Sequence, residues 1–139
     1  MKESDLQTMV ADYLRLQYPD VLFHSDFGSG IKLTMGQAAK QKRQNGGRRA
    51  WPDMFIAEVR VSQEAVENWD VKSFQAGLFL ELKKEGTRLK KKNGEWASEH
   101  IAEQADLLDR LEFRGYKAVF AVGFDEAKKI IDDYLKGVL

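Results

Sequence analysis

The middle of the chain reads Gly77-Leu78-Phe79-Leu80-Glu81-Leu82-Lys83, an apolar run that carries a carboxylate and an ammonium group two residues apart. Side chains alternate between the two faces of a strand, so the pattern places Phe79, Glu81 and Lys83 on one face and the leucines on the other. Glu and Lys are seldom buried without a partner or a bound ion. We therefore expect a central strand whose polar face forms a functional site.

A second apolar run lies upstream and begins with an acid directly after a proline, in Trp51-Pro52-Asp53-Met54-Phe55-Ile56-Ala57. We interpret residues 53–61 as a neighbouring strand that brings Asp53 to the site of Glu81 and Lys83. Taken alone, Asp53 fits an ordinary turn or capping acid. The Glu81 and Lys83 pair alone fits an exposed ion pair or the protection of an edge strand. The three residues together, set in apolar runs, favour a site.

The length and composition predict a single domain, residues 1–139. Acidic and basic residues balance at 22 each, and the absence of cysteine excludes disulfides and thiolate metal sites. No apolar run approaches the roughly 20 residues that a membrane-spanning helix needs. We expect a soluble cytoplasmic protein with no membrane partner.

The basic residues are unevenly distributed, with five in residues 40–49 and six in residues 83–92, whereas residues 99–112 and 125–133 are rich in acids. A neutral total can therefore contain a positive surface. A lysine-rich turn is often only a solvated one, but beside a phosphate-cleaving site it equally suits contact with a nucleic-acid backbone. The residues predicted to bind nucleic acid are Arg48, Arg49, Lys84, Arg88, Lys90, Lys91 and Lys92.

The remaining patterns predict the order helix, three strands, helix, strand, helix. A first helix is expected to about Gln17 with Ser4 and Gln7 as a capping box, a second from Ser98 to near Gly115, and a third after Gly123. The strands are expected at 21–24, 53–61, 77–83 and 116–122. Residues 34–44 fit either a polar helix or a basic loop, and residues 62–75 either a helix or a hairpin.

This order predicts an α/β fold. A strand, helix, strand passage usually makes the joined strands parallel, so we expect a single mixed sheet with helices on both faces.

Two carboxylates on neighbouring strands suit a divalent metal ion. Mg²⁺ takes oxygen ligands and often only one or two protein carboxylates, so Asp53, Glu81 and the Leu82 backbone carbonyl could hold it. A metal held there could neutralise charge and activate water for phosphodiester hydrolysis. Lys83 could then orient the attacking water or pair with the phosphate.

Weaker candidates surround this set. Gln104 lies on the apolar stripe of the following helix, where it could hold a water or Lys83, or serve as a core amide. Glu3 or Gln7 in the first helix could complete the site, although Glu3 also fits ordinary surface charge.

Other residues of chemical interest favour ordinary structural roles. His24 and His100 lack partners at metal-ligand spacing, and Asp26 is interpreted in the same way. Trp51 and Trp96 could stack on bases, but packing is favoured.

These motifs together resemble the PD-(D/E)xK nuclease superfamily and, more closely, its VRR-NUC members. The resemblance spans most of the chain, and its order and spacing are more specific than any single motif. It consists of Glu3 and Gln7, Pro52-Asp53 heading a strand, Glu81-Leu82-Lys83, Gln104, and Gly115-Tyr116. Two features depart from the pattern: Trp51 stands where a small residue commonly precedes Pro-Asp, and residues 62–75 exceed a tight hairpin.

The resemblance implies a restriction-endonuclease-like core and a Mg²⁺- or Mn²⁺-dependent endonuclease for structured or branched DNA, such as Holliday junctions or flaps, in DNA repair. Asp53 and Glu81 would be metal ligands, with Lys83, Gln104 and Glu3 as further catalytic residues. Similarity to junction resolvases implies a homodimer. A non-catalytic nucleic-acid-binding module and an enzyme for small phosphate esters are the alternatives, because fold likeness does not choose between them.

Overall fold

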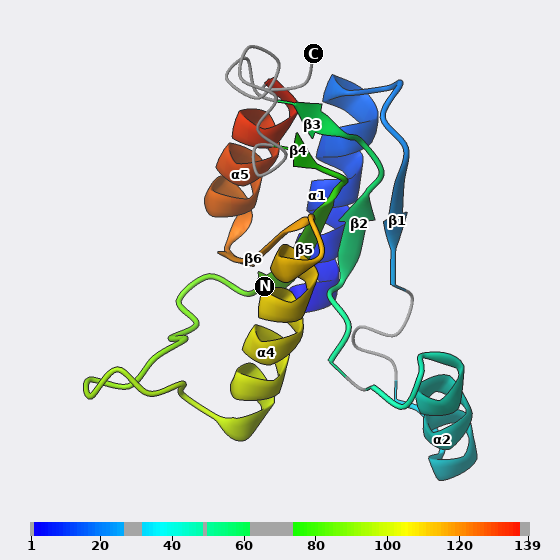
Figure 1. The fold of residues 1–139 in the computed structure, drawn as a ribbon, viewed down its shortest axis with the longest axis vertical. Coiled ribbons are helices and arrows are strands. Elements are labelled where there is room, and N and C mark those ends of the chain that lie inside the picture. Colours follow the sequence, from blue (N-terminus) through cyan, green and yellow to red (C-terminus); the bar gives the residue numbers. More distant parts are fainter. Residues whose placement is uncertain (1, 27–31, 49, 62–73, 137–139) are drawn as a thin grey trace.

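The computed structural model describes residues 2–26, 32–48, 50–61 and 74–136 (Figure 1). Its centre is a four-stranded sheet in the order β1-β2-β5-β6. These strands are Phe23–Ser25, Met54–Ile56, Leu78–Lys83 and Lys117–Val122. β2 pairs antiparallel with both β1 and β5, whereas β5 and β6 are parallel. The predicted α/β fold with a mixed sheet is therefore confirmed.

Helices cover both faces of this sheet. Helices α1 (Glu3–Gln17) and α5 (Phe124–Lys136) pack on one face, against the leucines of β5, while α4 (Glu99–Phe113) packs on the other. Ser98 caps α4 as predicted, because its Oγ accepts a hydrogen bond from the Ile101 N–H at 3.2 Å. No helix in the part of the chain that the structure describes is long and apolar enough to cross a membrane.

The two faces of β5 differ as the sequence predicts. Leu78, Leu80 and Leu82 are at most 1% exposed and form the main core with α1 and α5. Phe79 packs on the opposite face with the apolar side of α4. Burial of each leucine contributes roughly 1.5–3 kcal/mol, so the apolar face holds the strand in place and thereby fixes the position of the polar one.

The expected strand over residues 53–61 is interrupted, which corrects the sequence interpretation. β2 ends at Ile56, and β3 (Arg60–Val61) leaves the main sheet to pair with β4 (Phe74–Gln75) in a separate two-stranded sheet. The Tyr134 hydroxyl donates to the Glu58 carbonyl at 2.6 Å, which holds the chain where it bends. Most of the segment 62–75, whose form was left open, lies outside the described residues.

The expected capping box of Ser4 and Gln7 is also wrong. Helix α1 already begins at Glu3, and Asp5 accepts the hydrogen bond from the Lys2 backbone N–H at 3.3 Å. Gln7 is buried, and its amide donates to the Ser25 hydroxyl and to the Asp26 carbonyl. Gln7 therefore ties α1 to the end of β1 instead of capping its own helix.

The basic segment 34–44 forms a helix, α2 (Met35–Gln44), rather than a loop. Thr34 and Gln37 close a capping box with bonds of 3.1 and 3.0 Å, and the helix is followed by Gly46 and Gly47 with positive φ. None of its ten residues is buried by the described part of the chain, and Figure 1 shows it standing apart from the sheet. Local capping, not core packing, accounts for this helix.

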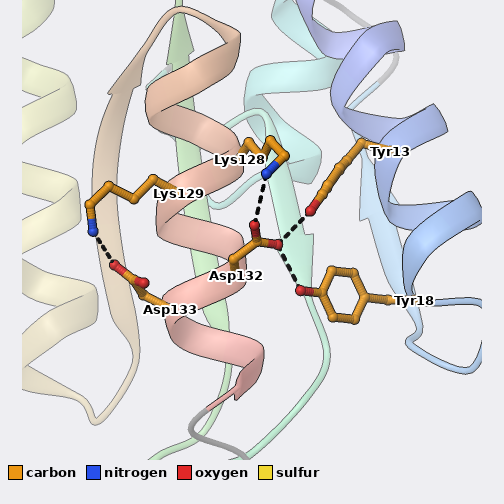
Figure 2. Close-up of polar contacts among 6 residues, drawn as sticks. All are labelled: Tyr13, Tyr18, Lys128, Lys129, Asp132 and Asp133. Carbon is orange, nitrogen blue, oxygen red and sulfur yellow. Dashed lines mark hydrogen bonds and ion pairs between the residues drawn. The ribbon is translucent and has the colours of Figure 1, made fainter.

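A shared carboxylate joins the first helix to the last (Figure 2). Asp132 Oδ1 accepts hydrogen bonds from the hydroxyls of Tyr13 at 2.6 Å and Tyr18 at 2.7 Å, and Oδ2 accepts from Lys128 at 3.2 Å. Burial by itself raises the pKa of Asp132, but these three donors outweigh it, so the pKa is lowered. Among the described residues, Asp133 on the same helix pairs with Lys129 alone, and that pair is exposed.

We expect Asp132→Ala to lower the free energy of unfolding by roughly 1–3 kcal/mol at pH 7, because it removes the acceptor of two tyrosine hydroxyls. The folded pKa lies below the unfolded one, so this stabilisation is present above the unfolded pKa and is lost as pH falls through the folded pKa. Urea unfolding at pH 7 and pH 3 should show the difference from wild type shrinking in acid.

Asp133→Ala is the matched control, because it makes the same change in helix propensity and breaks only an exposed ion pair. Equal destabilisation by the two substitutions would contradict the role assigned to Asp132.

Candidate active site

An open cleft of about 1040 Å³ lies where the end of β5, the start of β2 and the first turns of α4 meet α2. The five candidate residues from separate parts of the sequence all line it: Glu3, Asp53, Glu81, Lys83 and Gln104. The β2–β5 register explains the central pair. Met54 lies opposite Leu80, so one further step along both strands brings Asp53 towards Glu81.

Asp53 is fixed by the neighbouring strand. Its Oδ2 accepts a hydrogen bond from the Leu82 backbone N–H at 2.8 Å, and its own carbonyl accepts from the Asp26 N–H at 2.7 Å. Burial raises the pKa of the Asp53 carboxyl, and the Leu82 N–H offsets part of that rise. Asp53 is thus an oriented carboxylate whose charge is incompletely compensated by the protein.

Glu81 is more deeply buried, at 3% exposure. Its Oε1 accepts a hydrogen bond from the Gln104 amide at 2.8 Å, whereas Oε2 has no donor among the described residues. Burial, and then the nearby charge of Asp53, raise the pKa of Glu81 well above its ordinary value. The site therefore favours a proton on Glu81 unless a cation balances the two carboxylates.

Lys83 and Gln104 complete the buried polar group. The Lys83 ammonium lies 4.0 Å from Glu81 Oε1, which is a long contact for a buried ion pair, and its backbone carbonyl accepts from the Gly123 N–H at 2.8 Å. The Gln104 side-chain oxygen is buried without a donor in the described part of the chain. Two buried oxygens, on Glu81 and Gln104, are thus free of protein donors there.

These residues fit a hydrated divalent cation. No group of three or more His, Cys, Asp or Glu side chains in the described ranges is arranged to hold a metal by itself. Asp53 and Glu81 would therefore need other oxygen ligands. The Leu82 N–H faces Asp53, and a strand residue directs its N–H and C=O to the same edge, so the Leu82 carbonyl faces the site as well. Two carboxylates, a carbonyl and waters form a donor set suited to Mg²⁺.

The first helix contributes one of its two candidates. Glu3 lines the cleft, and its charge adds to the rise in pKa of both Asp53 and Glu81. Gln7 does not line it, because its amide is bound to Ser25 and Asp26.

The predicted nucleic-acid-binding residues occupy different places. Arg48 lines the cleft, and Arg49 lies outside the described residues. The others belong to the loop of residues 84–97, which we call the basic hairpin because Lys90 pairs with Trp96. It projects away from the body on the opposite side from α2, so its lysines do not line the cleft (Figure 1). The ring centroids of Trp96 and Phe120 lie 5.8 Å apart, and the Lys90 ammonium lies 4.6 Å from the centroid of the Trp96 ring.

The cleft also contains residues that the sequence interpretation missed or set aside. Lys42 and Arg43 reach it from α2, and His100 and Asp26 lie on its wall. His100 precedes Gln104 by one helical turn, and this spacing is a sequence pattern that could have placed it on the same face. Lys42 and Arg43 could not be placed while the segment fitted both a helix and a loop.

The chain is similar to a solved structure described as a VRR_NUC domain protein, with 24% sequence identity and a TM-score of 0.66. The match covers 99% of this chain and 91% of that chain. No protein-family model matches the chain. No curated protein sequence matches it significantly. The likeness establishes a shared fold.

We expect Glu81→Gln to raise the melting temperature of the metal-free protein, because the wild-type protein must take up a proton at Glu81 to bury it, whereas glutamine keeps the shape and needs no proton. The folded pKa of Glu81 is raised, so the folded state holds a proton that the unfolded state releases as pH rises, and stability falls over that range. The gain should therefore grow from pH 5 to pH 8, measured in EDTA.

Glu103→Gln, an exposed change on α4, is the control and should leave the melting temperature unchanged. A Glu81→Gln protein less stable than wild type at pH 8 would instead identify Glu81 and Lys83 as a stabilising ion pair.

Proposed function

We propose that the chain is a metal-dependent endonuclease that hydrolyses phosphodiester bonds in structured or branched DNA. The observation that carries the proposal is the convergence of Asp53, Glu81, Lys83 and Gln104 in one cleft, with a buried Glu81 oxygen left without a protein donor. The fold shared with a VRR_NUC domain protein supports a nuclease rather than another use of two carboxylates.

Asp53, Glu81 and the Leu82 carbonyl would hold Mg²⁺ or Mn²⁺, which would supply charge neutralisation at the phosphate and a more acidic water. Gln104 holds Glu81 through its 2.8 Å hydrogen bond to Oε1, and Oε2 has no donor among the described residues. Lys83 is buried beside Glu81, where its ammonium can pair with a phosphate oxygen or orient the attacking water. Glu3, at the cleft wall, completes the candidate catalytic set.

The distribution of basic residues supports a substrate with more than one arm. Lys42, Arg43 and Arg48 line the cleft, whereas the basic hairpin lies on the other side of the molecule (Figure 1). Phosphate contacts from both would position DNA without reading its sequence. We propose that the protein acts as a homodimer, because a twofold axis would give two sites for paired cuts in a branched substrate.

Asp53→Ala, Glu81→Ala and Lys83→Ala should each reduce Mg²⁺- or Mn²⁺-dependent cleavage by about 100-fold or more, because each removes a cation ligand or the charge that faces the phosphate. The assay uses labelled four-way junction, flap, single-stranded and duplex DNA with Mg²⁺, Mn²⁺ or EDTA. Circular dichroism checks that the variants are folded.

Asp109→Ala, which removes an exposed acid of α4 outside the cleft, should cleave like wild type. Salt-sensitive binding with no cleavage in any metal would show a non-catalytic binding module instead.

The basic hairpin should contribute affinity alone. Lys91→Ala combined with Lys92→Ala should weaken DNA binding to a similar degree for every sequence and lower the salt-dependence slope by about 2, or about 1 per lysine. Lys129→Ala combined with Lys136→Ala on α5 is the charge-matched control, expected to change neither. The quantity to measure is binding by fluorescence anisotropy across a salt series, and equal slopes in all three proteins would exclude the hairpin from the interface.

A further inference from the structure

Trp51 is an aromatic residue that is 37% exposed and lies on the wall of the cleft. Its neighbours Ala50 and Pro52 are buried, and Asp53 two residues on lines the same cleft. Pro52 favours an extended conformation for Trp51, and Trp51 and Asp53, two residues apart in the chain, both line the cleft. An indole therefore stands next to the candidate cation site.

The indole is held in a fixed orientation. Its Nε1 donates to the Asn45 carbonyl at 3.1 Å, so its only polar group is satisfied. The ring centroid lies 6.4 Å from that of Phe79, which in turn contacts Phe55 at 4.5 Å and Tyr116 at 5.2 Å. Trp51 is thus the exposed end of an aromatic group, and a flat ligand could stack on it with little loss of side-chain freedom.

Most of the basic residues of the cleft come from one segment of the chain. Lys42, Arg43 and Arg48 line the cleft, and no acidic residue occurs between Asp26 and Asp53 in the sequence. The acids that line the cleft lie outside that segment and include the candidate cation ligands Asp53 and Glu81. The segment that carries Trp51 therefore offers positive charge to a phosphate. A cleft of about 1040 Å³ lies just above the range for pockets that hold one small ligand, roughly 300–1,000 Å³. The cleft has room for a nucleotide beside the cation site.

We propose that Trp51 is a nucleobase-stacking subsite, so that the cleft selects a strand whose base next to the cleaved phosphate is unpaired. This inference rests on the proposed nuclease function and deepens it by naming the substrate class. A base can stack on the indole only after leaving its own helical stack, which favours single strands, flaps and open junction centres over continuous duplex. A residue that only packs would change stability without any dependence on the base.

The first test is a double-mutant cycle in which one change is the substitution of Trp51 and the other is the removal of one base from the DNA. Cleavage is measured for wild type and Trp51→Leu on single-stranded oligonucleotides that carry one abasic residue at successive positions. Trp51→Leu should raise KM on the order of ten- to a hundredfold, with a smaller change in kcat. One abasic position should weaken wild-type cleavage by a similar factor and should cause no further loss in Trp51→Leu.

Phe113→Leu is the matched control, because it removes an exposed aromatic ring of α4 that does not line the cleft. It should keep the wild-type KM and the wild-type response to abasic positions. If an abasic position weakened cleavage by Trp51→Leu by the same factor as it weakens cleavage by wild type, the two changes would be independent and the subsite would be overturned. An unchanged KM in Trp51→Leu would overturn it as well.

The second test does not need cleavage. Tryptophan fluorescence is titrated in EDTA with a single-stranded oligonucleotide, for wild type and for Trp51→Phe, which keeps an aromatic ring in case the leucine variant fails to fold. Wild type should be quenched more strongly than Trp51→Phe, and a duplex of the same sequence should quench both weakly. Equal quenching of the two proteins would overturn the subsite.

The two tests separate the subsite from the nuclease. A wild-type protein that shows Trp51-dependent quenching but cleaves nothing in any metal would retain the subsite and refute the nuclease. A wild-type protein that cleaves DNA regardless of Trp51 and of abasic positions would retain the nuclease and refute the subsite.

Discussion

The structure depends on how β5 is buried. Three leucines on one face of the strand pack against α1 and α5. Because side chains alternate along a strand, Glu81 and Lys83 must then lie on the opposite face, where they are buried even if no polar group there can pair with them. α4 provides one partner, the Gln104 amide, and leaves Oε2 of Glu81 without a donor in the described part of the chain. Core packing thus imposes an electrostatic cost at the site, and that cost is what makes the site receptive to a cation.

The contacts that contribute most to stability lie on one face of the sheet, and the candidate site lies on the other. The face opposite the site carries the main core and the Asp132 network, which ties α1 to α5 (Figure 2). Towards the cleft lies α2, with no residue buried by the described chain, and its link to the sheet includes the hydrogen bond from Trp51 to Asn45. A strongly packed half can hold carboxylates in place, while a lightly packed helix can adjust to a ligand.

The sequence predicts those parts of the fold that local patterns determine. The alternation in β5 and the cap at Ser98 depend on neighbouring residues only, and both are confirmed. The end of β2 was not predictable, because the bend after it is held by Tyr134, 76 residues away in the chain. Gln7 fits a capping pattern as well as the long-range contact that it makes, and sequence spacing does not separate the two. At the candidate site, the sequence predicted that Asp53 would lie beside the polar residues of β5, where the structure has it, but could not place α2 beside them.

One of the two acid-rich segments, residues 99–112, lies on α4 and borders the cleft region. Glu99, Glu103 and Asp106 border a second hollow of about 590 Å³, and Lys42 and Arg48 lie on its other side. A strand of phosphates entering here would be repelled by the acids of α4 and attracted towards the bases of α2, the helix to whose end Trp51 is hydrogen-bonded. Opposed charges on two walls can therefore direct a polyanion along one of them, although the chain as a whole has no net charge. For this reason the balance of 22 acids and 22 bases, taken as a total, says little about the surface, whereas the placement of those charges around the cleft shows where a polyanion would be attracted.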